Sequence, residues 1–107
     1  MAEQRTLVIV PAWNEEPSIA GVVRSLKNGG YDVLVIDDGS TDNTAGVARA
    51  EGALVAALPF NLGVGAALRC GFRYAVENGF NVAVQCDADG QHPIDHIEQL
   101  LSQMRNT

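Results

Sequence analysis

The segment QCDADGQHP, residues 85–93, carries the side chains of this sequence best suited to hold a cation. Asp87 and Asp89 follow the apolar residues 82–84 with one residue between them, and Gln91 adds a neutral oxygen. Two carboxylates near one point repel each other, and a bound Mg²⁺ or Mn²⁺ turns that repulsion into attraction. Mg²⁺ commonly combines one or two carboxylates with substrate phosphates. The segment therefore predicts a divalent metal site formed by Asp87, Asp89 and Gln91, with an ordinary polar turn as the alternative.

The spacing also resembles a calcium-binding loop of the EF-hand type, in which Glu98 would be the twelfth residue. That loop requires Gly at its sixth position, where this sequence has His92 followed at once by Pro93. An EF-hand is therefore excluded. His92 could ligate a metal itself, although a single His beside a Pro is more often a hydrogen-bonding loop residue.

Three other polar segments follow apolar runs: PAWNEE at 11–16, DDGSTD at 37–42 and PFNLGVG at 59–65. Ile36 and Asp38 are two residues apart in a predicted strand and so share a face. A nucleobase could lie against Ile36 while Asp38 bonds its edge or its ribose. Trp13 could stack on that base, or it could equally be an aromatic of the core or rim.

Simpler roles remain open for the polar residues of these segments, because helix N-termini attract Asp and Asn as caps. Asn14, Glu15 and Asp42 could serve only in that way. A nicotinamide-type dinucleotide site is not indicated, because the segment 11–16 lacks the glycine-rich turn that such a site needs.

The hydrophobic pattern predicts the elements that bring these segments together. Continuous apolar runs predict buried strands at 5–11, 32–38, 53–58 and 81–87, and helical spacing predicts helices at 16–30, 40–52, 65–79 and from Pro93 onward. In the third helix, Ala67, Leu68, Phe72, Ala75 and Val76 form the expected core stripe. The alternation predicts an α/β fold, a Rossmann-like three-layer half-domain with parallel strand order 3-2-1-4 and helices on both faces. All four polar segments would then meet at the carboxyl edge of the sheet.

Composition sets the broad limits on function. The chain of 107 residues is expected to form one domain, and its net charge of −6 argues against nucleic acid as a partner. A phosphorylated ligand remains compatible with that charge if a divalent cation bridges the two. No apolar run is long enough to span a membrane, the N-terminus does not resemble a signal peptide, and Cys70 and Cys86 are interpreted as reduced core residues. These features predict a cytosolic setting.

Taken together, VIVPAWNEE, VLVIDDGSTDNT, NLGVGAALRCGF and QCDADGQHP resemble the family 2 glycosyltransferases of the GT-A fold, in particular the dolichyl- or polyprenyl-phosphate mannose synthase type. The resemblance covers about residues 5–98. It implies that Pro11, Trp13 and Glu15 form the first nucleotide-contacting loop, although many relatives have Tyr at the position of Trp13. It also implies that Ile36 and Asp38 contact base and ribose.

The same resemblance makes Asp87, Ala88, Asp89 and Gln91 the DxD segment, which would hold the metal and the sugar diphosphate. Asp89 is the residue expected to be catalytic. Val64 departs from the family pattern, because many relatives carry Lys there, in NLGKG. A basic contact near the diphosphate could therefore be missing.

The expected function is transfer of a sugar, mannose or glucose, from a GDP- or UDP-linked donor to a polyprenyl phosphate or another acceptor. Relatives continue for roughly another hundred residues, so residues 1–107 are expected to be the N-terminal nucleotide-sugar-binding part, truncated after the DxD segment and the helix that follows it. In the longer protein this part would lie at the inner face of the membrane. The alternative is a non-catalytic nucleotide-binding module, or one that self-associates through its open sheet edge.

Overall fold

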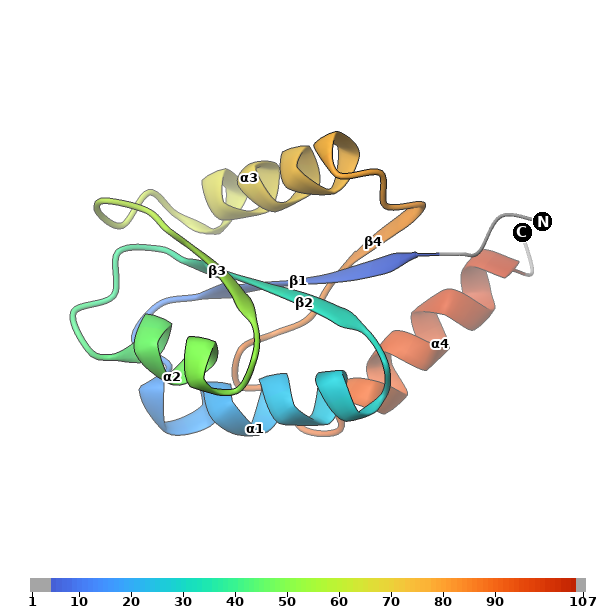
Figure 1. Ribbon diagram of the computed structural model, residues 1–107, viewed down its shortest axis with the longest axis horizontal. Helices are drawn as coiled ribbons and strands as arrows, with labels where there is room; N and C mark the ends of the chain where they lie inside the picture. Colours follow the sequence, from blue (N-terminus) through green and yellow to red (C-terminus); the bar gives the residue numbers. More distant parts are fainter. Residues whose placement is uncertain (1–4, 106–107) are drawn as a thin grey trace.

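The computed structural model describes residues 5–105, in which four strands and four helices alternate along the chain. In order they are β1 (Thr6–Ala12), α1 (Glu16–Asn28), β2 (Asp32–Asp37), α2 (Thr44–Ala50), β3 (Leu54–Ala57), α3 (Val64–Glu77), β4 (Val82–Gln85) and α4 (Pro93–Arg105). The strands are parallel and lie in the order β3-β2-β1-β4. The predicted α/β fold and strand order are confirmed (Figure 1).

The central strands β1 and β2 are the most apolar because both of their faces are covered. Residues 7–10 of β1 are fully buried, and residues 33–36 of β2 are nearly so. Val8 of β1 lies opposite Val33 of β2 on one side and Val84 of β4 on the other. The continuous apolar runs in the sequence therefore follow from burial on both faces.

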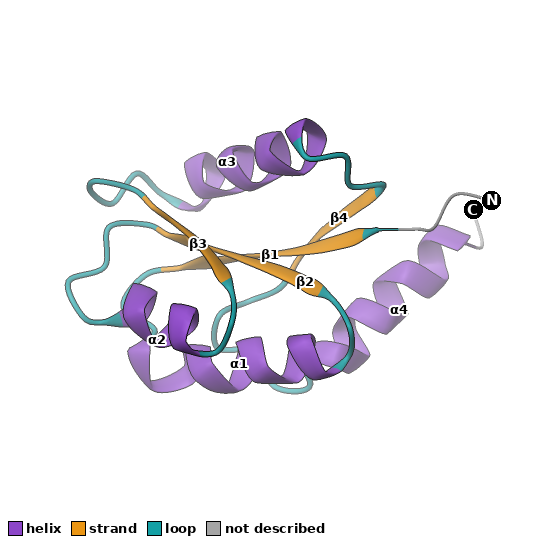
Figure 2. Cartoon of the chain, viewed as in Figure 1, coloured by secondary structure: helices purple, strands orange, loops and turns teal. Residues whose placement is uncertain are grey.

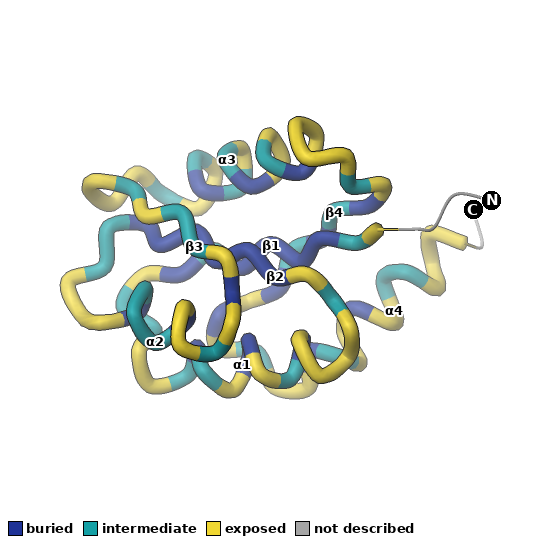
Figure 3. The backbone as a smooth tube through the Cα atoms, in the orientation of Figure 1, coloured by how far each residue is buried: buried dark blue, intermediate teal, exposed yellow. Residues whose placement is uncertain are grey.

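Helices cover the two faces of the sheet unequally, with α3 alone on one face and α1, α2 and α4 on the other (Figure 2). Val8 and Val10 of β1 belong to the larger core beneath α1, α2 and α4. Leu7 and Ile9 point to the opposite face and belong to the smaller core under α3. The buried residues accordingly gather along the sheet and on the inner sides of the helices (Figure 3).

The inner face of α3 consists of small residues, and the predicted apolar stripe was wrong in part. Ala67, Gly71 and Ala75 are the buried residues of this helix, whereas Phe72 is exposed and Val76 is 80% exposed. A Cβ at position 71 would lie 2.5 Å from Cγ2 of Ile9. The helix thus approaches the sheet too closely for large side chains between them. The pattern of apolar residues alone does not reveal this.

Helix α2 is shorter than the sequence indicates, since it begins at Thr44 rather than near residue 40. Residues 40–43 instead make hydrogen bonds to the segment after β1, described below. None of the helices in the described part of the chain is long and apolar enough to span a bilayer.

Candidate functional site

Four connections meet at the carboxyl edge of the sheet, where parallel α/β proteins bind their ligands. We call them loop 1 (13–15), loop 2 (38–43), loop 3 (58–63) and loop 4 (86–92), in the order in which they follow β1, β2, β3 and β4. Loops 2 and 3 project together at the left of Figure 1. Each loop ends where the next helix begins, so the helix positions determine how the loops lie.

Loop 1 is tied to loop 2 mainly through Asn14. The Asn14 N–H donates to Ser40 Oγ at 2.9 Å, and Asn14 Oδ1 accepts from the Thr41 N–H at 2.8 Å and the Thr41 hydroxyl at 3.2 Å. Asn14 has a φ of 53°, in the left-handed region that Asn tolerates better than most residues. An amide side chain in this strained position therefore fixes the two loops against each other.

The starts of α1 and α2 exchange further hydrogen bonds. The Asp42 carboxylate accepts from the Thr44 N–H at 3.0 Å, from the Thr44 hydroxyl and from the Glu16 N–H at 3.2 Å, while Glu16 Oε1 accepts from the Asn43 N–H at 2.7 Å. The hydrogen bond from the Thr44 hydroxyl lowers the pKa of Asp42. Asp42 is not the N-cap residue of either helix, because Glu15 and Asn43 take those positions, but its carboxylate accepts from the first N–H of both α1 and α2.

Asp38 ties loop 2 to loop 3. Its carboxylate is only 4% exposed and accepts from the Leu62 N–H at 2.8 Å and the Gly63 N–H at 2.9 Å. Gly39 has a φ of 74°, and a Cβ there would collide with the backbone of Phe60. A glycine and a buried carboxylate thus bring loop 3 against loop 2.

Ile36, the predicted neighbour of a base, lies in the core under α3 and is 0% exposed. In this structure α3 covers that face of the sheet. Asp38 comes after the last residue of β2 and turns to loop 3, so the two side chains do not form a common surface. Their contacts with base and ribose stay predictions.

Loops 1 and 3 enclose a hollow of about 220 Å³ at the end of β1. Its lining residues are Pro11, Ala12, Trp13, Asp38, Asn61, Gly63 and Val64. Trp13 is 52% exposed, so about half of its surface is open to solvent beside this hollow. Three of the residues predicted to bind substrate, Pro11, Trp13 and Asp38, therefore line one hollow.

Loop 4 follows β4 at the same edge of the sheet and carries the two aspartates predicted to bind a cation. Asp87 and Asp89 are exposed, whereas Ala88 between them is 5% exposed. The Gly90 N–H donates to the Asp87 carbonyl at 3.1 Å, which closes a tight turn. Both carboxylates therefore stand on a short turn whose middle residue is anchored in the protein.

A second hollow, of about 230 Å³, is lined by Cys86, Asp87, Gly90, Gln91, Pro93 and His96. Asp87 and Gln91 are thus brought together, and Asp89 lies on the turn outside this lining. His96, which sequence reasoning missed, also lines this hollow. Pro93 begins α4, and His96 follows it in the first turn of that helix, but the sequence alone does not reveal the direction in which α4 leaves the loop.

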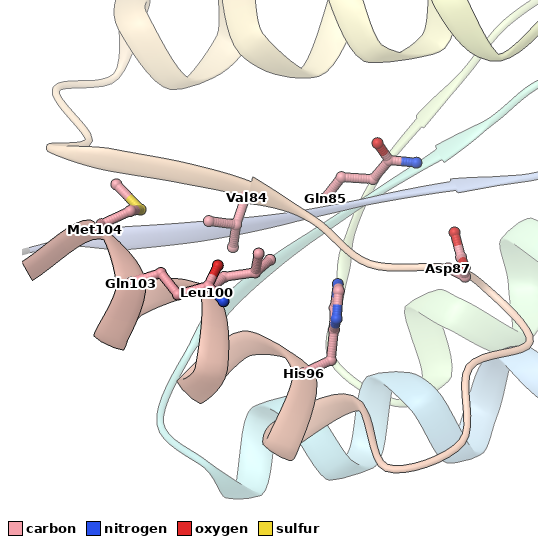
Figure 4. Close-up of a pocket in the computed structure, with 7 residues that line it drawn as sticks. All are labelled: Val84, Gln85, Asp87, His96, Leu100, Gln103 and Met104. Carbon is pink, nitrogen blue, oxygen red and sulfur yellow. The ribbon is translucent and has the colours of Figure 1, made fainter. Parts of the chain in front are cut away.

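A larger hollow of about 580 Å³ lies between β4 and α4 and includes Asp87 and His96 at one end. Figure 4 shows the His96 ring and the Asp87 carboxylate at this end, with Leu100 and Met104 farther along α4. This space adjoins the outer edge of β4, which pairs only with β1 among the described strands. At the start of loop 4, burial raises the pKa of the Cys86 thiol to about 11.

The donor set of loop 4 fits a cation that takes part of its ligands from elsewhere. In residues 5–105 no group of three or more His, Cys, Asp or Glu side chains is placed to hold a metal ion. Two exposed carboxylates and an amide oxygen are what Mg²⁺ uses together with substrate phosphates. The geometry thus combines a hollow suited to a flat ring with an acidic turn at the same sheet edge.

The sequence model of the family "Glycosyl transferase family 2" matches residues 7–107. A UDP-N-acetylglucosamine–dolichyl-phosphate N-acetylglucosaminyltransferase of Methanococcus voltae is 36% identical over 99% of this chain and 49% of its own. A polyprenol monophosphomannose synthase of Mycolicibacterium smegmatis is 35% identical over 92% of this chain and 40% of its own. The chain thus spans less than half the length of these relatives.

Solved structures agree with the sequence comparison. A mycobacterial protein superposes with a TM-score of 0.76 and 29% identity, over 97% of this chain and 38% of that one. The glucosyl-3-phosphoglycerate synthase of Mycobacterium tuberculosis, in complex with Mn²⁺, UDP-glucose and phosphoglyceric acid, gives a TM-score of 0.64 and 33% identity over 79% of this chain and 33% of that one.

Proposed function

Because this chain belongs to glycosyl transferase family 2, we propose that it forms the nucleotide-sugar-binding part of a metal-dependent transferase whose acceptor is a polyprenyl phosphate. Its relatives include glycosyltransferases with dolichyl- and polyprenyl-phosphate acceptors. The observation that carries the proposal is the meeting of loops 1, 3 and 4 at one edge of the sheet, which brings the hollow beside Trp13 and the acidic turn to the same edge.

The nucleoside part of the donor would occupy the hollow at the end of β1. The exposed indole of Trp13 offers a stacking surface for the base. The carboxylate of Asp38 holds the backbone of loop 3 in place and keeps the hollow open on that side. Loops 1 and 2 add rigidity, since hydrogen bonds between them fix the backbone around Trp13. UDP and GDP are both candidates for the nucleotide.

Asp87, Asp89 and Gln91 would hold Mg²⁺ or Mn²⁺, with the diphosphate supplying further oxygens. The bound cation would stabilise the negative charge that develops on the departing nucleoside diphosphate. The buried Ala88 fixes the turn, so both aspartates present their carboxylates on the same short segment. His96, beside Asp87 and Gln91, would add a contact to a phosphate. Asp89 is the residue that we expect transfer to depend on most.

A polyprenyl phosphate suits this site because it is already an anionic nucleophile and needs no general base. A hydroxyl acceptor would need a base, and the exposed carboxylates of loop 4 are assigned to the cation. We expect residues 1–107 to bind nucleotide weakly and to transfer little or no sugar, since the relatives that they match are more than twice as long.

Calorimetric titration with UDP and with GDP, each in the presence and absence of Mn²⁺, tests the proposal. Mn²⁺ should strengthen binding in the wild type and have no effect in Asp89→Ala. Asp95→Ala is the matched control, because Asp95 is also an exposed aspartate but lies within α4, outside both smaller hollows. Binding that is independent of Mn²⁺ and unchanged in Asp89→Ala would refute the role of the cation.

The alternative, a self-associating module without turnover, is favoured by the outer edge of β4. This edge has no strand beside it in the described sheet, and an unpaired edge invites strand addition. Sedimentation analysis over a range of concentrations, combined with a transfer assay, separates the two functions. Dimerisation without nucleotide binding would support the module.

A further inference from the structure

The Ser18 hydroxyl lies between loop 1 and loop 4, although it is 70 residues away from loop 4 in the sequence. Ser18 is half-buried in the first turn of α1. Its Oγ is 2.7 Å from Glu15 Oε2 in loop 1 and 3.1 Å from the Ala88 carbonyl oxygen in loop 4. The carbonyl belongs to the peptide that joins Ala88 to Asp89. One side chain therefore reaches a carboxylate of one loop and the backbone between the two aspartates of the other.

A serine hydroxyl carries a single proton, so it can donate to only one of these acceptors at a time. The distance to Glu15 is that of a charge-assisted hydrogen bond, and such bonds are stronger than bonds to a neutral carbonyl. As long as no other group donates to Glu15, the Ser18 hydroxyl therefore donates its hydrogen bond to the Glu15 carboxylate. The Ala88 carbonyl then lacks a donor among residues 5–105, because the structure shows no other hydrogen bond to it there, and the backbone of loop 4 is held less firmly.

We propose that Ser18 is a positioning residue that couples nucleotide binding at loop 1 to cation binding at loop 4; the proposal rests on the proposed function of the site. When a hydroxyl or imino group of the nucleotide donates to the Glu15 carboxylate, the Ser18 hydroxyl is free to donate its hydrogen bond to the Ala88 carbonyl instead. That hydrogen bond fixes the peptide that joins Ala88 to Asp89, and so fixes the backbone that carries both carboxylates. Nucleotide thereby strengthens cation binding, and by linkage the cation strengthens nucleotide binding to the same extent.

The change of acceptor by the Ser18 hydroxyl has a direct spectroscopic signature. A hydrogen bond to the Ala88 carbonyl polarises its peptide group, which includes the Asp89 N–H. Titration of the ¹⁵N-labelled chain with UDP, without any metal, should therefore shift the Asp89 amide resonance. The shift should be absent in Ser18→Ala and present in Ser18→Thr, which keeps the hydroxyl. Ser25→Ala is the matched control, since Ser25 lies two turns farther along α1, away from the loops.

Calorimetry measures the coupling itself, as the ratio of UDP affinities with and without Mn²⁺. One hydrogen bond of ordinary net strength corresponds to about a two- to tenfold change in that ratio. Ser18→Ala should lower the ratio by this factor and leave the metal-free affinity close to that of the wild type. Ser18→Thr should restore the ratio, and Ser25→Ala should not change it. Alanine favours helix, so circular dichroism should show the variant folded.

The outcomes separate this proposal from the function on which it rests. A wild-type chain that binds neither UDP nor GDP overturns the proposed function. A wild-type chain that binds UDP while its Asp89 resonance stays unchanged overturns the role of Ser18 alone. A full Mn²⁺ effect in folded Ser18→Ala would do the same.

Discussion

Replacing Asp38 with asparagine tests whether a buried carboxylate holds loop 3 against loop 2. Both Oδ atoms of Asp38 accept backbone N–H groups, from Leu62 at 2.8 Å and from Gly63 at 2.9 Å, and the side chain is 4% exposed. Asparagine keeps one acceptor oxygen but places an NH₂ group where the other oxygen of Asp38 accepts a hydrogen bond. One amide of loop 3 then loses its partner in a partly buried place.

The size of the effect follows from those two bonds. A hydrogen bond to a charged group contributes about 1.5–3 kcal/mol, and a neutral one about 1 kcal/mol. The asparagine side chain would keep one neutral bond in place of two charge-assisted ones, so we expect a loss of about 2–5 kcal/mol in the free energy of unfolding. For a chain of this size the urea midpoint should fall by about 1–3 M.

Urea unfolding followed by circular dichroism measures this loss, and Asp32→Asn is the control. Asp32 is exposed at the opposite end of β2, where surface substitutions change stability by about 0.5 kcal/mol at most. In folded Asp38→Asn, the amides of Leu62 and Gly63 should also exchange faster with solvent. The same stability in Asp38→Asn and in the control would refute the view that this carboxylate positions loop 3.

Three further changes test other parts of the site. In Gly39→Ala, strain at a φ of 74° and collision with Phe60 should lower the thermal midpoint, whereas Gly65→Ala, where space is open, should not. The pKa of the Cys86 thiol is raised to about 11, against 9.0 for an ordinary thiol. As pH rises, this thiol therefore loses its proton in the unfolded chain before it does so in the folded one. The free energy of unfolding should therefore fall as pH rises from about 9 to about 11. Urea unfolding should show a smaller fall over this pH range in Cys86→Ala. The same fall in both proteins would contradict the raised pKa. Trp13→Ala should weaken UDP binding about two- to tenfold in calorimetry, the strength of an aromatic stack, and unchanged affinity would exclude stacking.

The fold could be predicted from the sequence because burial on both faces leaves an unambiguous pattern. Continuous apolar runs such as residues 7–10 are typical of parallel strands that are buried on both faces. The order 3-2-1-4 is one of the two common orders of such sheets, and the edge on which the loops meet follows from the strands being parallel.

The details of the site could not be predicted in this way, because they depend on contacts between residues far apart in sequence. The sequence placed Ile36 and Asp38 on one face of β2 but did not show that α3 covers Ile36 on that face. The small residues of α3 allow a close approach that an apolar pattern does not encode. Ser18 and His96 carry no sequence signal, since only the packing of α1 and α4 brings them to loop 4.

The hydrogen bonds between the loops have a consequence for how such a domain can be altered by recombination. Asn14 and Ser40 are 26 residues apart, and Asp38 and Leu62 are 24 apart, yet each pair joins a side chain to the backbone of another loop. A chimera that imports loop 1 or loop 3 alone would replace one partner of one pair, and a chimera that imports loop 2 alone would replace one partner of both. Loops 1, 2 and 3 should therefore be inherited and transplanted together, so they are better exchanged as one block than loop by loop.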